Sequence, residues 1–422
     1  MLCGVGRRVI NPEPGHHLAG YGPDHPNAGV HDDIVVTAMY LSDGRKEAFL
    51  LTFDLIGLEA EFNLQVRQAV ADATGLTAEQ VFITATHVHS GPEVRKKHFN
   101  SGPTKIWRPD YNERLAVWSA QAAKDAKASA EECTLHYNYG YAAENMNRRY
   151  IFPDRRWLYI PDNKQLAGLS DQYVDRELGV VAFRRAGSRN QYKALVTNYT
   201  SHPLCVGNSS NLVSADFQGW IRRTIEDTFA GSMALTTTGA AGDNHPLMPE
   251  SGFSRAMKMG TNLGDLAITR TYDSVLVDYD TRLRFAWKPI TLKVKDRRSA
   301  DLLPRRDQRG LSWWAQQGRT EIQTAVSLLG IGPILLVGMP GEPVAELGAI
   351  LKWSSPFLKT YVLFQATDNL GYIATANQFL WGGYEVATTP LAQGEGERLV
   401  ELAVQTAKEL LDVDPLSLPA KE

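Results

Sequence analysis

Two histidines lie two positions apart in the segment THVHSGP, a spacing suited to metal binding. Residues i and i+2 of an extended chain point to the same side, so His87 and His89 share a face. Two adjacent imidazoles cannot both be charged cheaply at neutral pH, whereas a divalent cation uses them as neutral ligands. A pair of hydrogen-bonded histidines at a strand end would have the same spacing, so the motif alone leaves both interpretations open.

Three more polar residues directly follow apolar runs, namely His202 in TSHPLCVG, Asp243 in GAAGDNHP and Glu342 in MPGEPVAEL. Pro203 fixes the backbone after His202 and ends the strand, which holds the imidazole at the rim. Zinc accepts imidazole nitrogen and carboxylate oxygen, so His202 and Glu342 are candidate ligands. Each has a structural alternative, because a His-Pro pair often only ends a strand and a carboxylate can complement a helix dipole.

The loop at 239–246 consists largely of small residues that permit close backbone approach to a ligand. Its amides could stabilise an oxyanion, and a tight turn that caps a helix would have the same composition. The loop lacks the Lys-Ser/Thr ending of a phosphate loop. The chain also has no G-x-S-x-G elbow, no H-E-x-x-H and no G-x-G-x-x-G after a strand, which argues against three common enzyme classes.

These polar residues must be positioned by apolar, β-branched runs that alternate with helices. Strands are predicted at 35–41, 48–53, 81–86, 193–200, 233–238, 334–338 and 361–366, and helices at 59–74, 111–130, 215–229, from 343 and at 395–411. The segment 274–295 alternates like antiparallel strands. The sequence therefore predicts an α/β fold with a mixed, largely parallel sheet flanked by helices.

The predicted strand ends bring the candidate residues together. His87, His202, Asp243 and Glu342 each lie just past the carboxyl end of an apolar run. In open α/β sheets, ligands and catalytic groups gather at the carboxyl ends of the strands. We therefore expect residues that are far apart in the sequence to meet at one site.

The composition is that of a globular protein with a large core. The chain has 422 residues, of which 43% are hydrophobic and 22% charged, and its formal net charge is -3. There is no basic stripe of the kind that binds phosphate backbones, so nucleic acid is not an expected partner. No linker or long repeat marks a boundary, so we expect a single catalytic domain over residues 1–422.

Cysteine usage and the N-terminus indicate a reducing compartment. Cys3, Cys133 and Cys205 are too few and too scattered for a disulfide framework or a Cys-rich zinc site. The first residues lack the long apolar stretch of a signal peptide, and no segment approaches the roughly 20 apolar residues that a transmembrane helix needs. We therefore expect a cytoplasmic protein without a transmembrane segment. The sequence gives no information on oligomeric state.

A series of motifs resembles the catalytic domain of the neutral/alkaline (non-lysosomal) ceramidase family. The resemblance runs from about residue 4 to 410. In chain order the motifs are GVGRRVINPEPGHHLAGYG, GVHD, DLIGL, TATHVHSGP, NRR, SHPLCVG, SADFQGW, GAAGD, PGEP and GGYEVATT. The resemblance implies a zinc-dependent catalytic domain, and the immunoglobulin-like C-terminal domain of true neutral ceramidases is not expected within this length.

The resemblance also implies roles for individual residues. The zinc ligands would be His87, His202, Glu342 and Tyr384, of which the tyrosine rests wholly on the motif GGYEVATT. His89 and Arg148 would contact the substrate carbonyl or the tetrahedral intermediate. Where the family's G-D-x-S-P loop carries a serine regarded as catalytic, this chain reads G-D-N-H-P and has a histidine, His245.

The leading hypothesis is a zinc-dependent hydrolase that cleaves an amide (N-acyl) bond with metal-activated water. The candidate catalytic residues are His89, Arg148, Asp243 and His245. Of these, His89, Arg148 and His245 would stabilise or protonate developing charge. A first alternative is a zinc enzyme acting on a saccharide by hydrolysis or β-elimination. The aromatic residues that would suit such a ring-shaped substrate are Tyr141, Tyr150, Trp313 and Trp314. A second alternative is a metal-bound binding protein without turnover.

Overall fold

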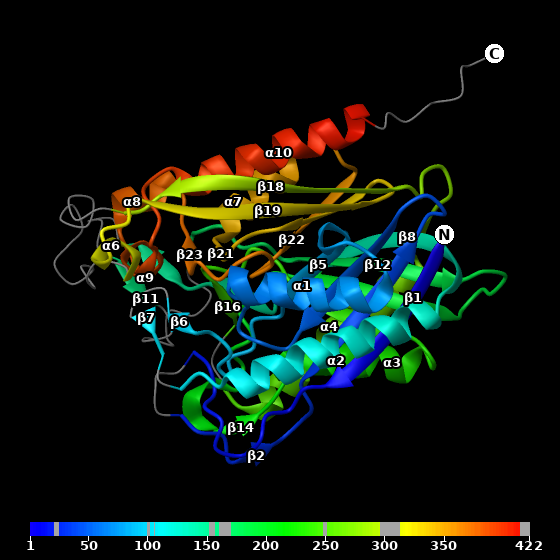
Figure 1. The fold of residues 1–422 in the computed structure, drawn as a ribbon, viewed down its shortest axis with the longest axis horizontal. Helices are drawn as coiled ribbons and strands as arrows, with labels where there is room; N and C mark the ends of the chain where they lie inside the picture. Colours follow the sequence, from blue (N-terminus) through cyan, green and yellow to red (C-terminus); the bar gives the residue numbers. More distant parts are fainter. Residues whose placement is uncertain are drawn as a thin grey trace.

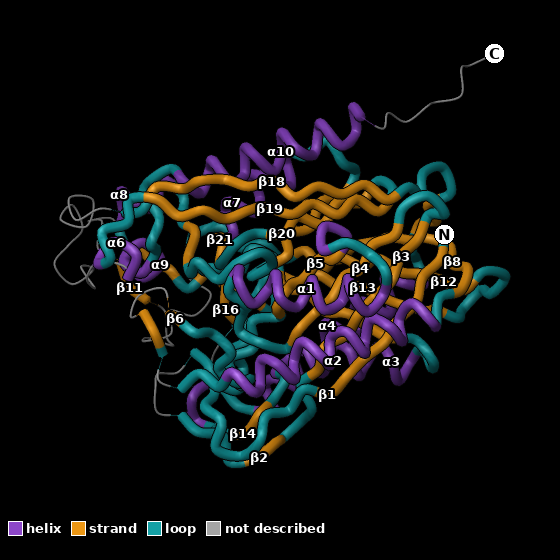
Figure 2. Tube along the Cα trace, in the orientation of Figure 1, coloured by secondary structure: helices purple, strands orange, loops and turns teal. Residues whose placement is uncertain are grey.

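The computed structural model describes residues 1–20, 25–98, 102–104, 106–151, 157–159, 170–247, 251–295 and 313–413. These residues form four layers, in which two sheets stack face to face and helices cover the outer face of each sheet (Figures 1 and 2). The predicted α/β class with helices flanking a mixed sheet is confirmed. The prediction of one domain over the whole chain stays a prediction.

The large sheet has the strand order β15-β13-β12-β8-β1-β3-β4-β5, and β17 pairs with β8. Its strands are β1 (Leu2–Val9), β3 (Val35–Ser42), β4 (Glu47–Phe53), β5 (Val81–Ala85), β8 (Glu131–Tyr141), β12 (Glu177–Arg185), β13 (Tyr192–Tyr199), β15 (Met233–Thr238) and β17 (Val275–Val277). Every residue of β3 and β13 is buried. Strands covered on both faces have such continuous apolar runs, which is why the sequence indicated several of them.

The second sheet has the order β18-β19-β20-β22. Its strands are β18 (Leu283–Lys293), β19 (Glu321–Ile331), β20 (Ile334–Gly338) and β22 (Lys359–Leu363). The segment 274–295 is antiparallel as predicted, but its two strands belong to different sheets, since β17 pairs with β8 and β18 with β19. The strands at 131–141, 177–185 and 321–331 were not among the predicted elements.

The expected predominance of parallel pairing is wrong. Among the described residues, β4–β5 and β13–β15 are the parallel pairs of the large sheet, and β20–β22 is that of the second sheet. One cause is the tight turn between β3 and β4, where Asp43 Oδ1 accepts hydrogen bonds from the N–H groups of Arg45 and Lys46. Such a turn can join only antiparallel strands, because parallel strands need a longer crossover.

Helices cover both outer faces. The helices α1 (Ala60–Thr74), α2 (Pro109–Ala128), α3 (Asp216–Thr228) and α4 (Phe253–Tyr272) pack on the large sheet, and α7 (Ala345–Ser354) and α10 (Glu395–Val413) pack on the second sheet (Figure 1). Helix α2 begins with Pro109, which is pre-set for a first helical position. Helix α1 ends where Gly75 takes a φ of 76° and its N–H bonds back to Ala71. None of the described helices is long and apolar enough to cross a bilayer.

Short elements connect the layers near the strand ends. They are β2 (Gly29–Val30), η1 (Ala78–Gln80), β6 (Lys97–His98), β7 (Gly102–Pro103), β9 (Asn145–Asn147), β10 (Arg149–Ile151), β11 (Trp157–Tyr159), η4 (Gly207–Ser209), β14 (Leu212–Val213), β16 (Asn244–Pro246), α6 (Trp313–Gln316), β21 (Glu342–Pro343), β23 (Tyr372–Ile373), α8 (Ala376–Trp381) and α9 (Tyr384–Thr388).

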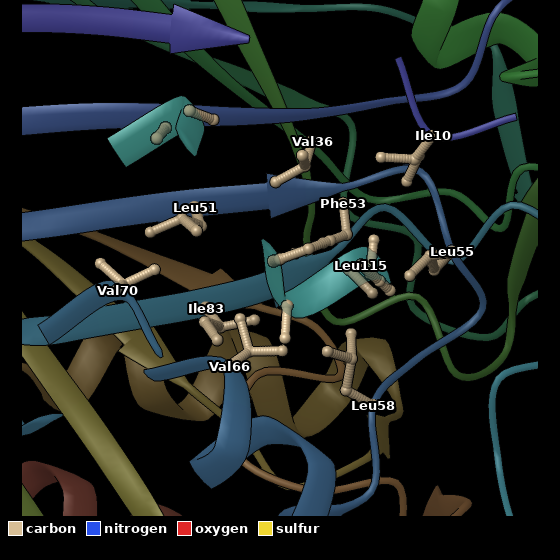
Figure 3. Close-up of a cluster of buried hydrophobic side chains, with 14 of the residues drawn as sticks. Ile10, Val36, Leu51, Phe53, Leu55, Leu58, Val66, Val70, Ile83 and Leu115 are labelled. Carbon is tan, nitrogen blue, oxygen red and sulfur yellow. The ribbon is translucent and has the colours of Figure 1, made fainter. Parts of the chain in front are cut away.

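The hydrophobic core lies between the layers. Figure 3 shows part of the cluster beneath α1 and α2, where Leu51 and Ile83 of the sheet meet Val66, Val70 and Leu115 of the helices. A second cluster fills the space between the two sheets, and a third lies between the second sheet and α7 with α10. The three cysteines are buried free thiols.

A buried ion pair ties α3 to the strand ends of the large sheet. Arg222 donates from Nη1 and Nη2 to the two carboxylate oxygens of Asp54, at 2.9 and 2.6 Å. Asp54 directly follows β4, and it also accepts hydrogen bonds from the Thr86 hydroxyl and the Val35 N–H. Because Thr86 precedes His87, the Asp54–Arg222 ion pair fixes the backbone at the point where β5 ends.

Replacing Arg222 with leucine should lower the free energy of unfolding by about 3–5 kcal/mol, because the Asp54 carboxylate stays buried without its cation. Urea denaturation measures this change. The matched control is Arg8→Leu, whose ion pair with Asp125 is partly exposed and should contribute less than about 1 kcal/mol. Equal losses in the two variants would contradict the argument, and Asp54→Asn should recover part of the stability of the Arg222→Leu protein.

Candidate metal centre

Three imidazoles meet at the carboxyl ends of two strands of the large sheet. His87 and His89 follow β5 and His202 follows β13, and one ring nitrogen from each lies within 4.8 Å of those of the other two. The ring centroids of His87 and His202 are 4.8 Å apart. His87 and His202 are almost completely buried. Histidines separated by more than a hundred residues therefore form one group that could hold a metal ion.

Backbone carbonyls fix the tautomers of two of these rings. His87 Nδ1 lies 2.6 Å from the carbonyl oxygen of Ile56, and His202 Nδ1 lies 2.6 Å from that of Ala241. A carbonyl can only accept, so each Nδ1 carries the proton and donates it. Each Nε2 then presents a lone pair to the centre. Metal-binding histidines are commonly oriented by such a contact.

The carboxylate of Glu342 completes a cluster of hydrogen-bond acceptors. Its Oε2 lies 3.6 Å from His87 Nε2 and 3.4 Å from His202 Nε2, while Oε1 accepts a hydrogen bond from Gln365 Nε2 at 3.2 Å. Within the described part of the chain, His202 Nε2 and Glu342 Oε2 are buried without a hydrogen-bond partner. His87 Nε2 lies 3.3 Å from His89 Nε2, which leaves His202 Nε2 and Glu342 Oε2 as two buried acceptors without a donor among the described residues. Such a pair is unfavourable unless a cation lies nearby, so this donor set fits a metal ion.

Burial keeps the imidazoles neutral. It is the main cause that lowers the pKa of His87 and of His202 to about 3. The Glu342 carboxylate opposes this shift at His87, whereas the Arg148 guanidinium adds to it at His202. Burial also lowers the pKa of His89 and of His245 well below its usual value. Metal ions bind the neutral form of histidine, so protons do not compete for these nitrogens near neutral pH.

The backbone around the centre is strained. His87 has a φ of 70° and Gln365 has a φ of 48°, which are rare values for residues with a side chain. They are two of the three non-glycine residues with positive φ in the described ranges. One bears a candidate ligand and the other holds the Glu342 carboxylate. Such strain persists only where the surrounding structure enforces it, and it often marks functional sites.

Arg148 lies beside the histidines, in the connection between β9 and β10. Its Nε donates to Glu385 Oε1 at 2.6 Å, and its Nη1 donates to His245 Nε2 at 2.6 Å. The guanidinium carbon lies 5.1 Å from the ring centre of Tyr372 and 5.2 Å from that of Tyr384. The arginine is therefore held on several sides, with a cation–π contact to two rings.

Glu385 holds two arginines at once. Its Oε2 accepts from Arg149 Nη1 at 2.8 Å, while Oε1 accepts from Arg148. Burial alone would raise the pKa of the Glu385 carboxyl, but the two guanidinium groups outweigh burial and hold this pKa below its usual range. The carboxylate is therefore ionised, and it orients Arg148 from the side of α9.

The predicted ligands and substrate contacts occupy one region, with one difference from the expected arrangement. Tyr384 begins α9 and its ring lies 5.4 Å from that of Tyr372, which in turn stacks on His202 at 6.4 Å. The closely spaced nitrogens, however, belong to His87, His202 and His89, and His89 was expected to contact substrate instead. The ligand role of Tyr384 stays a prediction, as do the roles of the other residues.

Asp243 has a structural environment that its predicted catalytic role did not anticipate. Its Oδ1 accepts from the N–H of Ala345 and from Asn244 Nδ2, and its Oδ2 accepts from Asn147 Nδ2 and Gln378 Nε2. Its backbone carbonyl accepts from the N–H of Arg148 at 2.8 Å. These contacts join α7, α8 and β9 beneath the site. We therefore expect Asp243 to position its neighbours and not to react.

Of the aromatic residues that would suit a saccharide, Tyr150 lies in β10 next to Arg149, whereas Tyr141 and Trp314 lie elsewhere. Tyr141 lies at the end of β8, is 70% exposed and packs against Tyr139. Trp314 lines a separate cleft of about 630 Å³ with Glu59, Lys97 and Arg319. The side chain of Trp313 lies outside the described residues.

Some contributors to the site were not found from the sequence. Glu385 lies next to Tyr384 in the motif GGYEVATT, so its position was a usable signal. Gln365 and Tyr372 carry no such signal, because they reach the centre through the strained backbone after β22 and through the short strand β23.

Comparisons with known proteins identify a family and a shared fold. Residues 2–267 match the family described as neutral/alkaline non-lysosomal ceramidase, N-terminal. A neutral ceramidase from Pseudomonas aeruginosa has a TM-score of 0.76 and 18% identity, covering 97% of this chain and 75% of that chain. A ceramidase complexed with C2 has a TM-score of 0.78 and 17% identity, covering 98% and 75%. At these identities the two structures show a shared fold. No curated protein matches the sequence.

Adding zinc to chelator-treated protein should raise its melting temperature. Zinc at about 100 times its dissociation constant adds about 2.7 kcal/mol to the stability of the native state, because the unfolded chain lacks the assembled site. Differential scanning fluorimetry measures the shift. His202→Ala should lose most of the shift, whereas His136→Ala should keep it, because His136 lies on β8 and contacts Thr134. A shift that survives in His202→Ala would rule out this centre.

Proposed function

Because the chain belongs to the neutral/alkaline non-lysosomal ceramidase family, we propose that it is a zinc-dependent hydrolase that cleaves the amide bond of an N-acyl lipid. The observation that carries the proposal is the buried meeting of His87 Nε2, His202 Nε2 and Glu342 Oε2 beside the guanidinium of Arg148. This arrangement combines a cation site with a fixed positive charge, which are the two features that hydrolysis of an unactivated amide needs.

The donor set favours zinc among common divalent cations. Imidazole nitrogen and a single carboxylate suit zinc, whereas calcium and magnesium prefer a shell of oxygens. His87, His202 and Glu342 would hold the ion, with Tyr384 as the fourth ligand that the family resemblance implies. Once bound, the ion supplies Lewis acidity and lowers the pKa of water.

Arg148 is suited to stabilise the negative charge that develops on the amide oxygen. Its guanidinium stays protonated at any working pH, and Glu385 with the two tyrosine rings fixes its direction. A charge fixed before the reaction needs no rearrangement when the carbonyl becomes an oxyanion, which is the main advantage of a preorganised site.

His245 is suited to donate a hydrogen bond and unsuited to act as a base. Arginine can only donate, so the contact with Arg148 Nη1 occupies the lone pair of His245 Nε2. The proton therefore lies on Nδ1. His245 is held by the pairing of β16 with β9, where it lies opposite Met146. It would orient Arg148 and donate from Nδ1 to the reacting group, where the resembling family has a serine.

The substrate class follows from the family. Family membership favours a ceramide-like lipid amide over a saccharide, and turnover over a purely metal-bound binding protein. Tyr141 and Trp314, which were candidates for binding a sugar ring, do not lie beside the histidines. We therefore propose an N-acylated amphiphile as the substrate.

Zinc-loaded protein should release fatty acid from an N-acyl sphingoid substrate, and Glu342→Gln should lower kcat/KM by about 10³-fold, which corresponds to several kcal/mol of lost transition-state stabilisation. Liquid chromatography of the released acid measures the rate. Glu61→Gln, which changes an exposed carboxylate of α1, is the control and should retain full activity. Turnover of a glycoside panel with no amide cleavage would refute the proposal.

His245→Ala should lower kcat by about 10²-fold, the usual effect of losing one donor to an oxyanion, with zinc content unchanged. His245→Asn should recover part of the loss, because its amide can donate from near the position of Nδ1. Steady-state kinetics with metal analysis separate the two effects. Unchanged turnover in His245→Ala would remove this residue from the mechanism and leave the metal centre intact.

A further inference from the structure

The short helix α9 brings two side chains to the metal centre in its first turn. Tyr384 and Glu385 are its first two residues, and the helix ends at Thr388. An isolated helix of this length is not stable in water, because nucleation costs more than a few hydrogen bonds return. The position of both side chains therefore depends on what holds the two ends of α9.

The N-terminal end of α9 is held from the side of β10. Arg149 Nη2 donates to the carbonyl oxygen of Gly382 at 2.7 Å. Gly383 has a φ of 114°, and a Cβ at this position would lie 2.5 Å from Arg149 Nη1. A glycine is needed there for both its backbone angle and the close approach of the guanidinium.

The C-terminal end of α9 is held by a buried lysine. Lys295 Nζ donates to the carbonyl oxygens of Val386 at 2.7 Å and Ala387 at 3.1 Å, and only 2% of the residue is exposed. A cation at the C-terminus of a helix satisfies its last carbonyls and complements the helix dipole. The lysine backbone is fixed as well, because its N–H donates to the carbonyl of Pro390.

The surrounding backbone makes this contact rigid. Val294 forms an antiparallel bridge with Leu391, and the N–H of Ala392 donates to the carbonyl of Lys293. The end of β18 is thus paired with the segment that directly follows α9. A displacement of Lys295 would therefore be passed to both the helix and the chain that leaves it.

We infer that Lys295 is a positioning residue of the metal centre, which holds the C-terminal carbonyls of α9 and thereby fixes Tyr384 and Glu385. The inference rests on the proposed function, since it treats that centre as the working site. Lys295 touches neither the histidines nor Arg148 in the contacts described above. It acts through α9, in the way that outer contacts orient metal ligands.

The test is zinc affinity, measured by chelator competition on the full chain. Lys295→Met keeps the length of the side chain and removes its donors, and it should weaken zinc binding by about 10-fold, the lower range for loss of an outer contact. Lys293→Met is the matched control, because Lys293 lies two residues away with an exposed side chain and should bind zinc like the wild type. Wild-type affinity in Lys295→Met would overturn the inference.

A double-mutant cycle with Tyr384→Phe separates positioning from general damage to the fold. If Lys295 acts through α9, its effect should depend on Tyr384. In the Tyr384→Phe background, Lys295→Met should therefore weaken zinc binding by less than about 3-fold, because residues that act together have non-additive effects. The full 10-fold effect in that background would overturn the inference. If Lys295→Met does not fold, Gly383→Ala provides a second test, because it displaces α9 from its other end and should also weaken zinc binding. Wild-type zinc affinity in Gly383→Ala would overturn the inference.

These measurements stay informative if the proposed function fails. Zinc affinity does not depend on turnover, so a wild-type protein that binds zinc without cleaving amides would refute the proposed reaction and leave the role of Lys295 open to the same test. Unaltered affinity in Lys295→Met together with normal amide cleavage would refute the role of Lys295 alone.

Discussion

The centre of this protein depends on an electrostatic conflict. The carbonyls of Ile56 and Ala241 force the protons of His87 and His202 onto Nδ1, so that two lone pairs and the carboxylate of Glu342 face one another away from water. Protonation of an imidazole would relieve the conflict, but burial lowers the pKa of both histidines to about 3 and so disfavours it near neutral pH. A cation removes it at once, because the ion pairs with all three acceptors. The strained backbone at His87 and Gln365 shows that the fold enforces this arrangement.

The rest of the site is built from contacts that restrict motion. The Asp54–Arg222 pair fixes the end of β5, Asp243 joins α7 and α8 beneath the loop, and Glu385 sets the direction of Arg148. Few of these groups are themselves suited to react with a substrate. They supply the fixed directions that a charged transition state needs, which flexible side chains in water do not supply.

The candidate metal ligands were easier to predict from the sequence than the residues that position them. His87, His202 and Glu342 follow apolar runs, and the rule that strand ends converge was enough to place them in one region. Tyr384 came from family resemblance alone. Gln365 and Lys295 could not be found, because their roles depend on a backbone angle and on two carbonyls that only the folded chain brings within reach.

The order and orientation of the strands were predicted less well than the α/β fold class, for a physical reason. The strand β8 has alternating polar and apolar residues at its exposed end and gave no clear signal, whereas the apolar run of β12, LGVVAF, was a usable signal that the prediction missed. Without them the remaining strands alternate with helices, which is typical of parallel sheets. The real strand order inserts these two antiparallel partners between β1 and β13.

The two stacked sheets each contribute to the same cluster of acceptors. The histidines follow β5 and β13 of the large sheet, whereas Glu342 lies in β21, in the chain that follows β20 of the second sheet. An ion bound at this point would be held by residues from both layers and would cross-link them at the rim. Ion binding and the packing of the two sheets would then be thermodynamically coupled. The ion would bind tightly only when the two sheets are correctly packed, even before substrate binds.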